Sequence, residues 1–130
     1  MLKHWDTPFA STLLPNVEVV IGGNLGAVTL RVSADRSWEV RFTDVVALKV
    51  AEEEWDDNRR FALQQEPNAA KVCSYRWDSS PWLNEIDQVR WEQIFSRQLS
   101  HFVLLGADHN VEVLATEPQI SLRQYSGKPE

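Results

Sequence analysis

The chain has 130 residues, a formal net charge of −6, one cysteine and six tryptophans. This length suits one domain of ordinary size and is too short for a TIM barrel or a full propeller. Clustered Lys and Arg would be needed for general nucleic-acid binding, and the longest basic run is Arg59-Arg60. The acidic balance therefore argues against nucleic acid and, if anything, favours a basic protein partner.

The sequence also predicts a compartment. There is no apolar window of about 18 residues that could span a membrane. The first residues, Met1 to Asp6, lack the basic and apolar regions of a secretory signal. Because Cys73 is the single cysteine, the chain forms no internal disulfide. We expect a cytoplasmic protein without a membrane contact.

The sequence predicts mainly β-strands in the first half of the chain. Residues 1–16 contain two prolines and little periodicity, which predicts an irregular lead-in. Residues 17–21 form a β-branched run closed by glycines, which predicts a strand and a turn. Apolar and polar residues alternate in 27–33 and 38–42, and a further strand is predicted over 44–51. In that last strand we expect one face to carry the apolar residues Val46, Leu48 and Val50.

The turn between the two alternating strands can be tested by parity. A three-residue loop at 35–37 keeps the apolar residues of both strands on one face, whereas a two-residue loop buries the wrong face. The same register sets Arg31 opposite Arg41, and like charges in that position are unfavourable. We therefore expect an acid nearby and name Glu18 on the preceding strand.

The second half combines a helix with further strands. A strand is predicted over 71–77, and the run Ser79-Ser80-Pro81 is typical of a helix start. Apolar residues at helical spacing then extend the helix from 81 to about 98, with a break near Arg90 as an alternative. A hairpin turning at 107–110 and a strand over 120–125 complete the fold.

These elements predict a fold class. We expect a mainly β (α+β) domain over residues 1–125, followed by a disordered tail at 126–130. Its architecture is a curved antiparallel sheet or open barrel of about eight strands, with one helix packed on it near 81–98.

The tryptophans divide into two groups. Five of the six precede an acid, which in strands follows from an apolar ring facing inward and an acid facing outward. We expect four to lie in the core because they fall on the apolar phase of strands or helix: Trp38, Trp77, Trp82 and Trp91. Trp5 and Trp55 fall outside regular elements and are candidates for a surface or groove.

An acidic segment surrounds Trp55. The acids are Glu52, Glu53, Glu54, Asp56 and Asp57. The segment lacks the pattern and the glycine of a calcium loop, so metal binding ranks below protein docking. Either it is a solvated charged loop, or the ring is an anchor within an acidic rim that steers a basic partner.

Histidines near the hairpin suggest a different chemistry. His101, His109, Asp108 and Glu112 could ligate zinc or act as acid and base, as in a small metal-dependent hydrolase. No HExxH or CxxC motif accompanies them, and Asp108-His109 suits an ordinary turn. We predict no metal or cofactor and no catalytic residue, and we interpret Cys73 as a small core residue rather than a nucleophile.

A resemblance rests on three stretches of the chain. Residues 38–51, the run Ser80-Pro81-Trp82-Leu83 and residues 101–118 together resemble small uncharacterised bacterial cytosolic β-rich proteins, some of them similar to immunity proteins. The resemblance covers about residues 38–120 and carries over no catalytic residue. The likeness of some of these proteins to immunity proteins implies, as one candidate function, the neutralisation of a toxin, and the acidic charge of the chain would suit a basic one.

The functional prediction is non-enzymatic protein binding with an unidentified partner. The alternatives are the immunity protein and the metal-dependent hydrolase that uses His101 and His109. A homodimer formed through an exposed strand edge is a further hypothesis.

Overall fold

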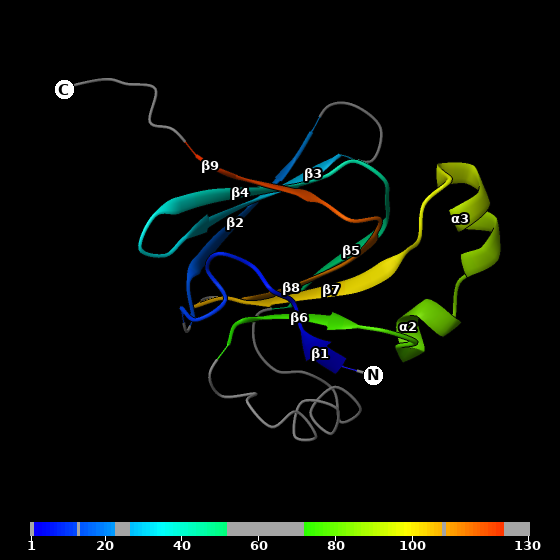
Figure 1. Ribbon diagram of the computed structural model, residues 1–130, viewed down its shortest axis with the longest axis horizontal. Helices are drawn as coiled ribbons and strands as arrows, with labels where there is room; N and C mark the ends of the chain where they lie inside the picture. The colour runs from blue at the N-terminus through cyan, green and yellow to red at the C-terminus, as the bar shows by residue number, and fades with distance from the viewer. Residues whose placement is uncertain (1, 13, 23–26, 52–71, 108, 124–130) are drawn as a thin grey trace.

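A computed structural model describes residues 2–12, 14–22, 27–51, 72–107 and 109–123. Within these ranges two antiparallel sheets lie face to face, and a pair of short helices projects at one end (Figure 1). The mainly β prediction is confirmed. The described chain has nine strands in two sheets, so the expectation of a single curved sheet or open barrel of about eight strands is wrong.

The larger sheet has five strands in the order β1-β6-β7-β8-β5. Their bounds are β1 Leu2–His4, β6 Ser74–Trp77, β7 Ser100–Leu105, β8 Asn110–Ala115 and β5 Val45–Ala51. The predicted hairpin is confirmed as β7 and β8, which pair from Ser100–Ala115 to Leu105–Asn110.

The smaller sheet has four strands in the order β2-β3-β4-β9. Their bounds are β2 Asn16–Ile21, β3 Val28–Ser33, β4 Ser37–Phe42 and β9 Gln119–Leu122. The chain crosses between the sheets three times, through the longer connection from β1 to β2 and at two short corners, β4 to β5 and β8 to β9. These corners are tied together, because Thr116 donates its backbone N–H to the Asp44 carbonyl at 3.2 Å and its hydroxyl to the Asp44 carboxylate at 3.1 Å.

The main core lies between the sheets. The alternation in β3 is confirmed, since its inward residues Val28, Leu30 and Val32 are buried. Aromatic rings fill the centre, where the ring centroids of Phe42 and Phe102 lie 5.4 Å apart.

Trp5 belongs to this core, which corrects the expectation of a surface position. It is 4% exposed, and its ring lies 4.8 Å from that of Phe102. The cause is that residues 1–16 are not wholly irregular. β1 pairs with β6, and Trp5, the residue after β1, donates its N–H to the Ser74 carbonyl at 3.1 Å. This pairing places the Trp5 side chain between the sheets.

The β3–β4 turn has the predicted odd length but another register. Its three residues are 34–36, so Arg31 lies opposite Glu39 rather than Arg41. Glu18 flanks Arg31 on β2, as predicted. The guanidinium lies 3.8 Å from Glu18 and 3.9 Å from Glu39. A shift of two residues keeps the apolar face inward and replaces a repulsive pair with an attractive one.

β5 departs from simple alternation. A bulge between Val45 and Ala47 turns the strand, so that Val45 and Leu48 pack on the main core while Val46 and Ala47 face a second cluster. The prediction of one face shared by residues 46, 48 and 50 is therefore wrong, because Val46 and Leu48 face different clusters. Val50 is 48% exposed.

The single helix near 81–98 is also corrected. Two helices replace it, α2 Pro81–Asn84 and α3 Gln88–Phe95. The break lies before Arg90, where Asp87 caps α3 by accepting the Arg90 N–H at 3.2 Å. α3 ends at Phe95, and its C-cap Ser96 has a left-handed φ of 56°. None of the described helices has the length and apolar composition to cross a membrane.

Candidate functional site

A chain of buried polar groups links the helices to the larger sheet. The Ser80 hydroxyl lies 2.6 Å from Nδ1 of His101, and Nε2 of His101 lies 2.7 Å from the Glu112 carboxylate. All three side chains are at most 2% exposed. A buried histidine here has a partner at each ring nitrogen, so the group is fully satisfied.

Three different elements position these groups. Ser80 is the N-cap of α2 and follows β6, while His101 and Glu112 lie on the paired strands β7 and β8. His101 is opposite Leu114, so Glu112 is its diagonal neighbour on the same face. The imidazole is enclosed by indoles, since the rings of Trp77 and Trp82 each lie 5.3 Å from it.

Serine, histidine and carboxylate are also the groups of a hydrolytic triad. Here, however, the Ser80 hydroxyl also accepts the Leu83 N–H at 3.1 Å, which caps α2. With Ser80 and His101 at 0% exposure, a substrate carbonyl has no path to the hydroxyl in this conformation. The arrangement acts as an anchor that fixes the start of α2 to the sheet.

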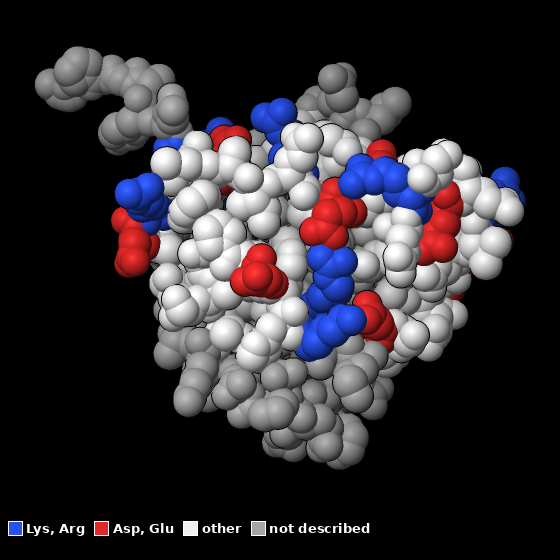
Figure 2. Space-filling model, viewed as in Figure 1, with Lys and Arg blue, Asp and Glu red and all other residues white. Residues whose placement is uncertain are grey.

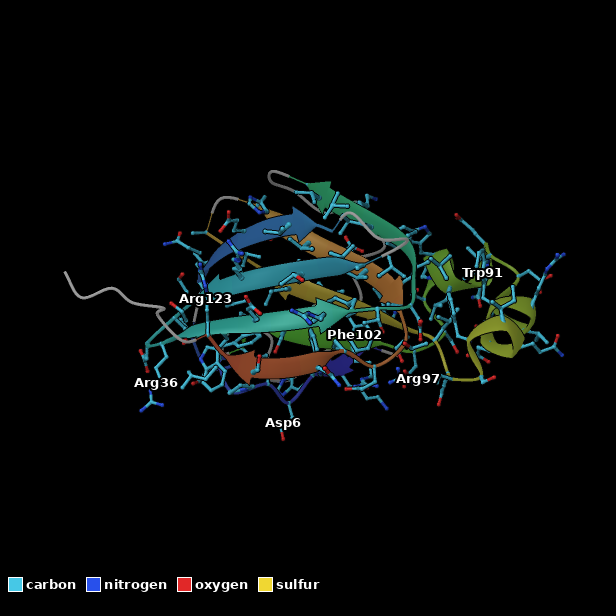
Figure 3. All side chains as sticks on the ribbon, turned by 90° about the horizontal axis from the view of Figure 1, so that it is seen from above. Asp6, Arg36, Trp91, Arg97, Phe102 and Arg123 are labelled. Atoms are coloured by element: carbon cyan, nitrogen blue, oxygen red, sulfur yellow. The ribbon has the colours of Figure 1, made fainter. Side chains whose placement is uncertain are left out.

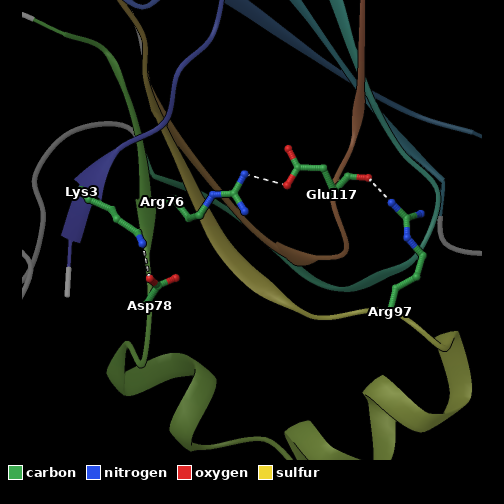
Figure 4. Close-up of polar contacts among 5 residues, drawn as sticks. All are labelled: Lys3, Arg76, Asp78, Arg97 and Glu117. Carbon is green, nitrogen blue, oxygen red and sulfur yellow. Dashed lines mark hydrogen bonds and ion pairs between the residues drawn. The ribbon is translucent and has the colours of Figure 1, made fainter.

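A second set of contacts fixes the end of α3. The Glu92 carboxylate accepts the Leu99 N–H at 2.8 Å and the Gln88 amide at 3.0 Å. Arg97, just beyond α3, lies 3.7 Å from the Asp44 carboxylate and donates to the Glu117 carbonyl at 3.0 Å (Figure 4). The helical arm, residues 81–95, is therefore tied to both sheet corners as well as to β7.

The two faces of α3 differ sharply. Trp91 and Phe95 stack at 5.6 Å on the inner face and pack against a cluster that contains Leu83. On the outer face Val89 is 67% exposed and Ile94 is 58% exposed. We predicted that one apolar stripe of the helix faces the core. Trp91 does lie on the inner face, whereas Val89 lies on the exposed outer face. Trp82 and Trp91 are half-buried rather than fully buried.

Ion pairs cover the middle of the face seen in Figure 1. Lys3 lies 2.8 Å from Asp78, and Arg76 lies 2.6 Å from Glu117. Figure 2 shows cationic and anionic side chains next to one another there. Exposed pairs of this kind contribute little to stability, and their mixed signs give the face no net field for steering a ligand.

The sequence-predicted candidates have different outcomes. The acidic segment at 52–57, with Trp55, lies outside the described residues, as does Asp108. The hairpin separates the two histidines: His101 pairs with Leu114, while His109 follows the far end, about 13 Å along the strands. Among the described residues no three His, Cys, Asp or Glu side chains form a metal site.

Sequence reasoning found Glu112 as a companion of His101 but missed the bond to Ser80. The N-cap role of Ser80 was readable from the Ser-Pro pair and is confirmed. The contact with His101 depends on the pairing of β6 with β7, which is set by tertiary packing and leaves no local signal.

Cys73 lies in the main core, as predicted. It is 1% exposed, and its thiol donates weakly to the Phe9 carbonyl at 3.4 Å. Burial raises the pKa of the thiol to about 11, so it stays protonated at neutral pH.

Comparison with protein-family models, curated proteins and solved structures finds no significant match to this chain. A function as an immunity protein therefore remains a proposal.

Proposed function

We propose that this chain is a non-catalytic protein-binding domain that docks its partner on the outer face of α3. The observation that carries the proposal is the pair of exposed apolar residues, Val89 and Ile94, on an arm that projects from one end of the sheets (Figure 1). Exposed apolar side chains on a projecting helix are typical of docking surfaces.

The arm is held in place before any partner arrives. Its start is fixed by Ser80 and His101, and its end by Glu92 and Arg97. A helix this short is unstable in isolation, so these contacts supply the order that binding would otherwise have to create. A preorganised surface loses less conformational entropy on binding.

The charge on this face indicates the chemistry of the partner. The outward positions of α3 are Val89, Arg90, Gln93 and Ile94, which carry one cation and no acid. In a chain of net charge −6, these four positions form an apolar surface that carries one cation, although the exposed Asp87 caps the start of the same helix. The partner should therefore offer an apolar groove flanked by carboxylates, which would receive the helix and pair with Arg90.

The acidic segment around Trp55 supports a second candidate. Five acids beside one indole suit a basic partner, and a basic toxin would make this chain an immunity protein. This surface would have the opposite charge preference from α3, so partner charge distinguishes the two proposals.

Site-specific photo-crosslinking tests the location. A photoreactive residue at Gln93 on α3 should crosslink a protein in native cell extract, whereas the same residue at Arg41 on β4 should not. The crosslinked peptide should be apolar and acidic. Crosslinking that appears only from position 55 to a basic peptide would favour the second candidate, and crosslinking from position 41 alone would contradict docking on α3.

A further inference from the structure

Arg36 and Arg123 lie at the end of the molecule opposite the arm (Figure 3), and two adjoining hollows open there. The larger, about 440 Å³, is lined by Arg36, Ser37, Leu122 and Arg123. The smaller, about 250 Å³, shares Arg36 and includes the half-buried ring of Trp38. The larger volume is within the range of small-ligand sites.

The backbone brings the two arginines together. Arg123 continues the β9–β4 ladder by donating its N–H to the Ser37 carbonyl at 2.8 Å. Arg36 precedes Ser37 and accepts the Ala34 N–H at 2.9 Å, which closes the β3–β4 turn. Arg123, just beyond β9, therefore lies opposite Ser37, and Arg36 is the residue before Ser37 in the turn. Both arginine side chains are exposed and line the same hollow.

These arginines differ from others of the fold. Arg31, Arg76 and Arg97 each lie within 4 Å of a carboxylate. Among the described residues Arg36 and Arg123 have no such partner, as is also true of Arg41 and Arg90, but of these only Arg36 and Arg123 line this hollow. Like charges on adjacent strands repel, and an anion held between them would convert that repulsion into attraction.

We propose that this hollow binds the oxyanion of a small molecule, a phosphate or a carboxylate. The guanidinium forks of Arg36 and Arg123 donate to the anion, and the Ser37 hydroxyl supplies a further donor. Leu122, which is 42% exposed, offers an apolar wall to the remainder of the ligand. The adjoining hollow beside Trp38 gives room for a ligand larger than a lone ion.

The experiment is titration of the full chain, followed by amide chemical shifts, with inorganic phosphate, phenyl phosphate and benzoate as probes. Phenyl phosphate or benzoate should shift the amides of Ser37 and Leu122, and binding should weaken as salt is added. Binding of phenyl phosphate alone assigns a phosphate ligand, and binding of both assigns a general oxyanion site. Binding of neither probe would overturn the proposal.

Variants locate the site. R36Q and R123Q should each weaken binding of the tighter probe about tenfold, because each removes charged hydrogen bonds. R41Q is the matched control, an exposed arginine on β4 whose loss should leave the affinity unchanged. Equal weakening by all three would indicate non-specific charge attraction and overturn the assignment. All three should fold, since each side chain is exposed. The result does not depend on docking at α3.

Discussion

At the scale of single residues, the buried His101 contacts groups from several elements. Its ring joins Ser80, Glu112 and two indoles, so one side chain secures β7, β8 and the start of α2. Buried polar groups are costly when one partner is missing, because the others lose water without gaining a replacement bond.

Replacement of His101 by alanine should lower the free energy of unfolding by more than about 2 kcal/mol, since Ser80 and Glu112 lose buried partners. Urea denaturation measures the change. H4A is the matched control, because the His4 side chain is exposed and its ring meets that of Tyr75 edge-on, and it should cost less than about 1 kcal/mol. Equal costs, or labelling of Ser80 by a fluorophosphonate in the native protein, would contradict a purely structural anchor.

Cys73 gives a prediction in alkaline solution. Because burial raises the pKa of the folded thiol from 9.0 to about 11, the unfolded chain loses this proton first as the pH rises. The thiol's contribution to stability is complete below about pH 9 and falls by up to about 3 kcal/mol as the pH approaches 11.

Urea denaturation between pH 8 and pH 11, compared with C73A, isolates this contribution, since lysines and tyrosines titrate in both proteins. The wild type should lose more stability over this range than the variant. Parallel curves would show that the thiol ionises equally in both states.

The burial of a residue was predictable where the alternation of apolar and polar residues along its own strand determines it. Alternation identified the inward side of β3 and the core role of Cys73, whereas Trp5 was misplaced. Its burial depends on the pairing of Leu2–His4 with Ser74–Trp77, strands separated by about 70 residues, and a three-residue strand has no readable period.

At the scale of elements, polar contacts hold the helical arm in place, although α3 lacks a fully buried face. α3 has no fully buried residue, and the Glu92 carboxylate holds its end by capping the Leu99 N–H. The sequence predicted one helix because the apolar spacing continues through 85–87. Asp87 competes there by capping a new helix, and such a cap interrupts a helix that periodicity alone would continue.

Loss of the Glu92 carboxylate should loosen the arm without unfolding the sheets. In E92A, amide hydrogen exchange over 88–95 should rise about tenfold, while exchange in β7 and β8 stays near the wild-type rate. Q93A is the control, because Gln93 is exposed on the same helix. Unchanged exchange over 88–95 in E92A would contradict the proposed tether.

At the scale of the whole molecule, the two ends of the pair of sheets carry different features. The arm with Trp91 lies at one end, and Arg36 and Arg123 lie at the other (Figure 3). Apart from β1, the positions of the described strands were predictable from alternation and turns. The division into two sheets was not, because it depends on the β4–β5 and β8–β9 corners and on partners distant in sequence.

The candidate site was less accessible to sequence reasoning than the fold. Tryptophan beside acids drew attention to Trp5 and Trp55; the first is buried, and the second lies outside the described residues. The surface proposed for docking includes a residue that the apolar helix pattern had assigned to the core. Such a pattern does not reveal which apolar side chain has no packing partner in the folded protein. Val89 is the example.

The most direct measurement is the dissociation constant of the crosslinked partner for wild type, V89D/I94D, V50D and W55A. V89D/I94D should weaken binding at least about a hundredfold, because both charges would be buried against an apolar groove. V50D, which alters an exposed valine on β5, and W55A should stay within about threefold of wild type. Retained affinity in V89D/I94D together with its loss in W55A would contradict docking on α3.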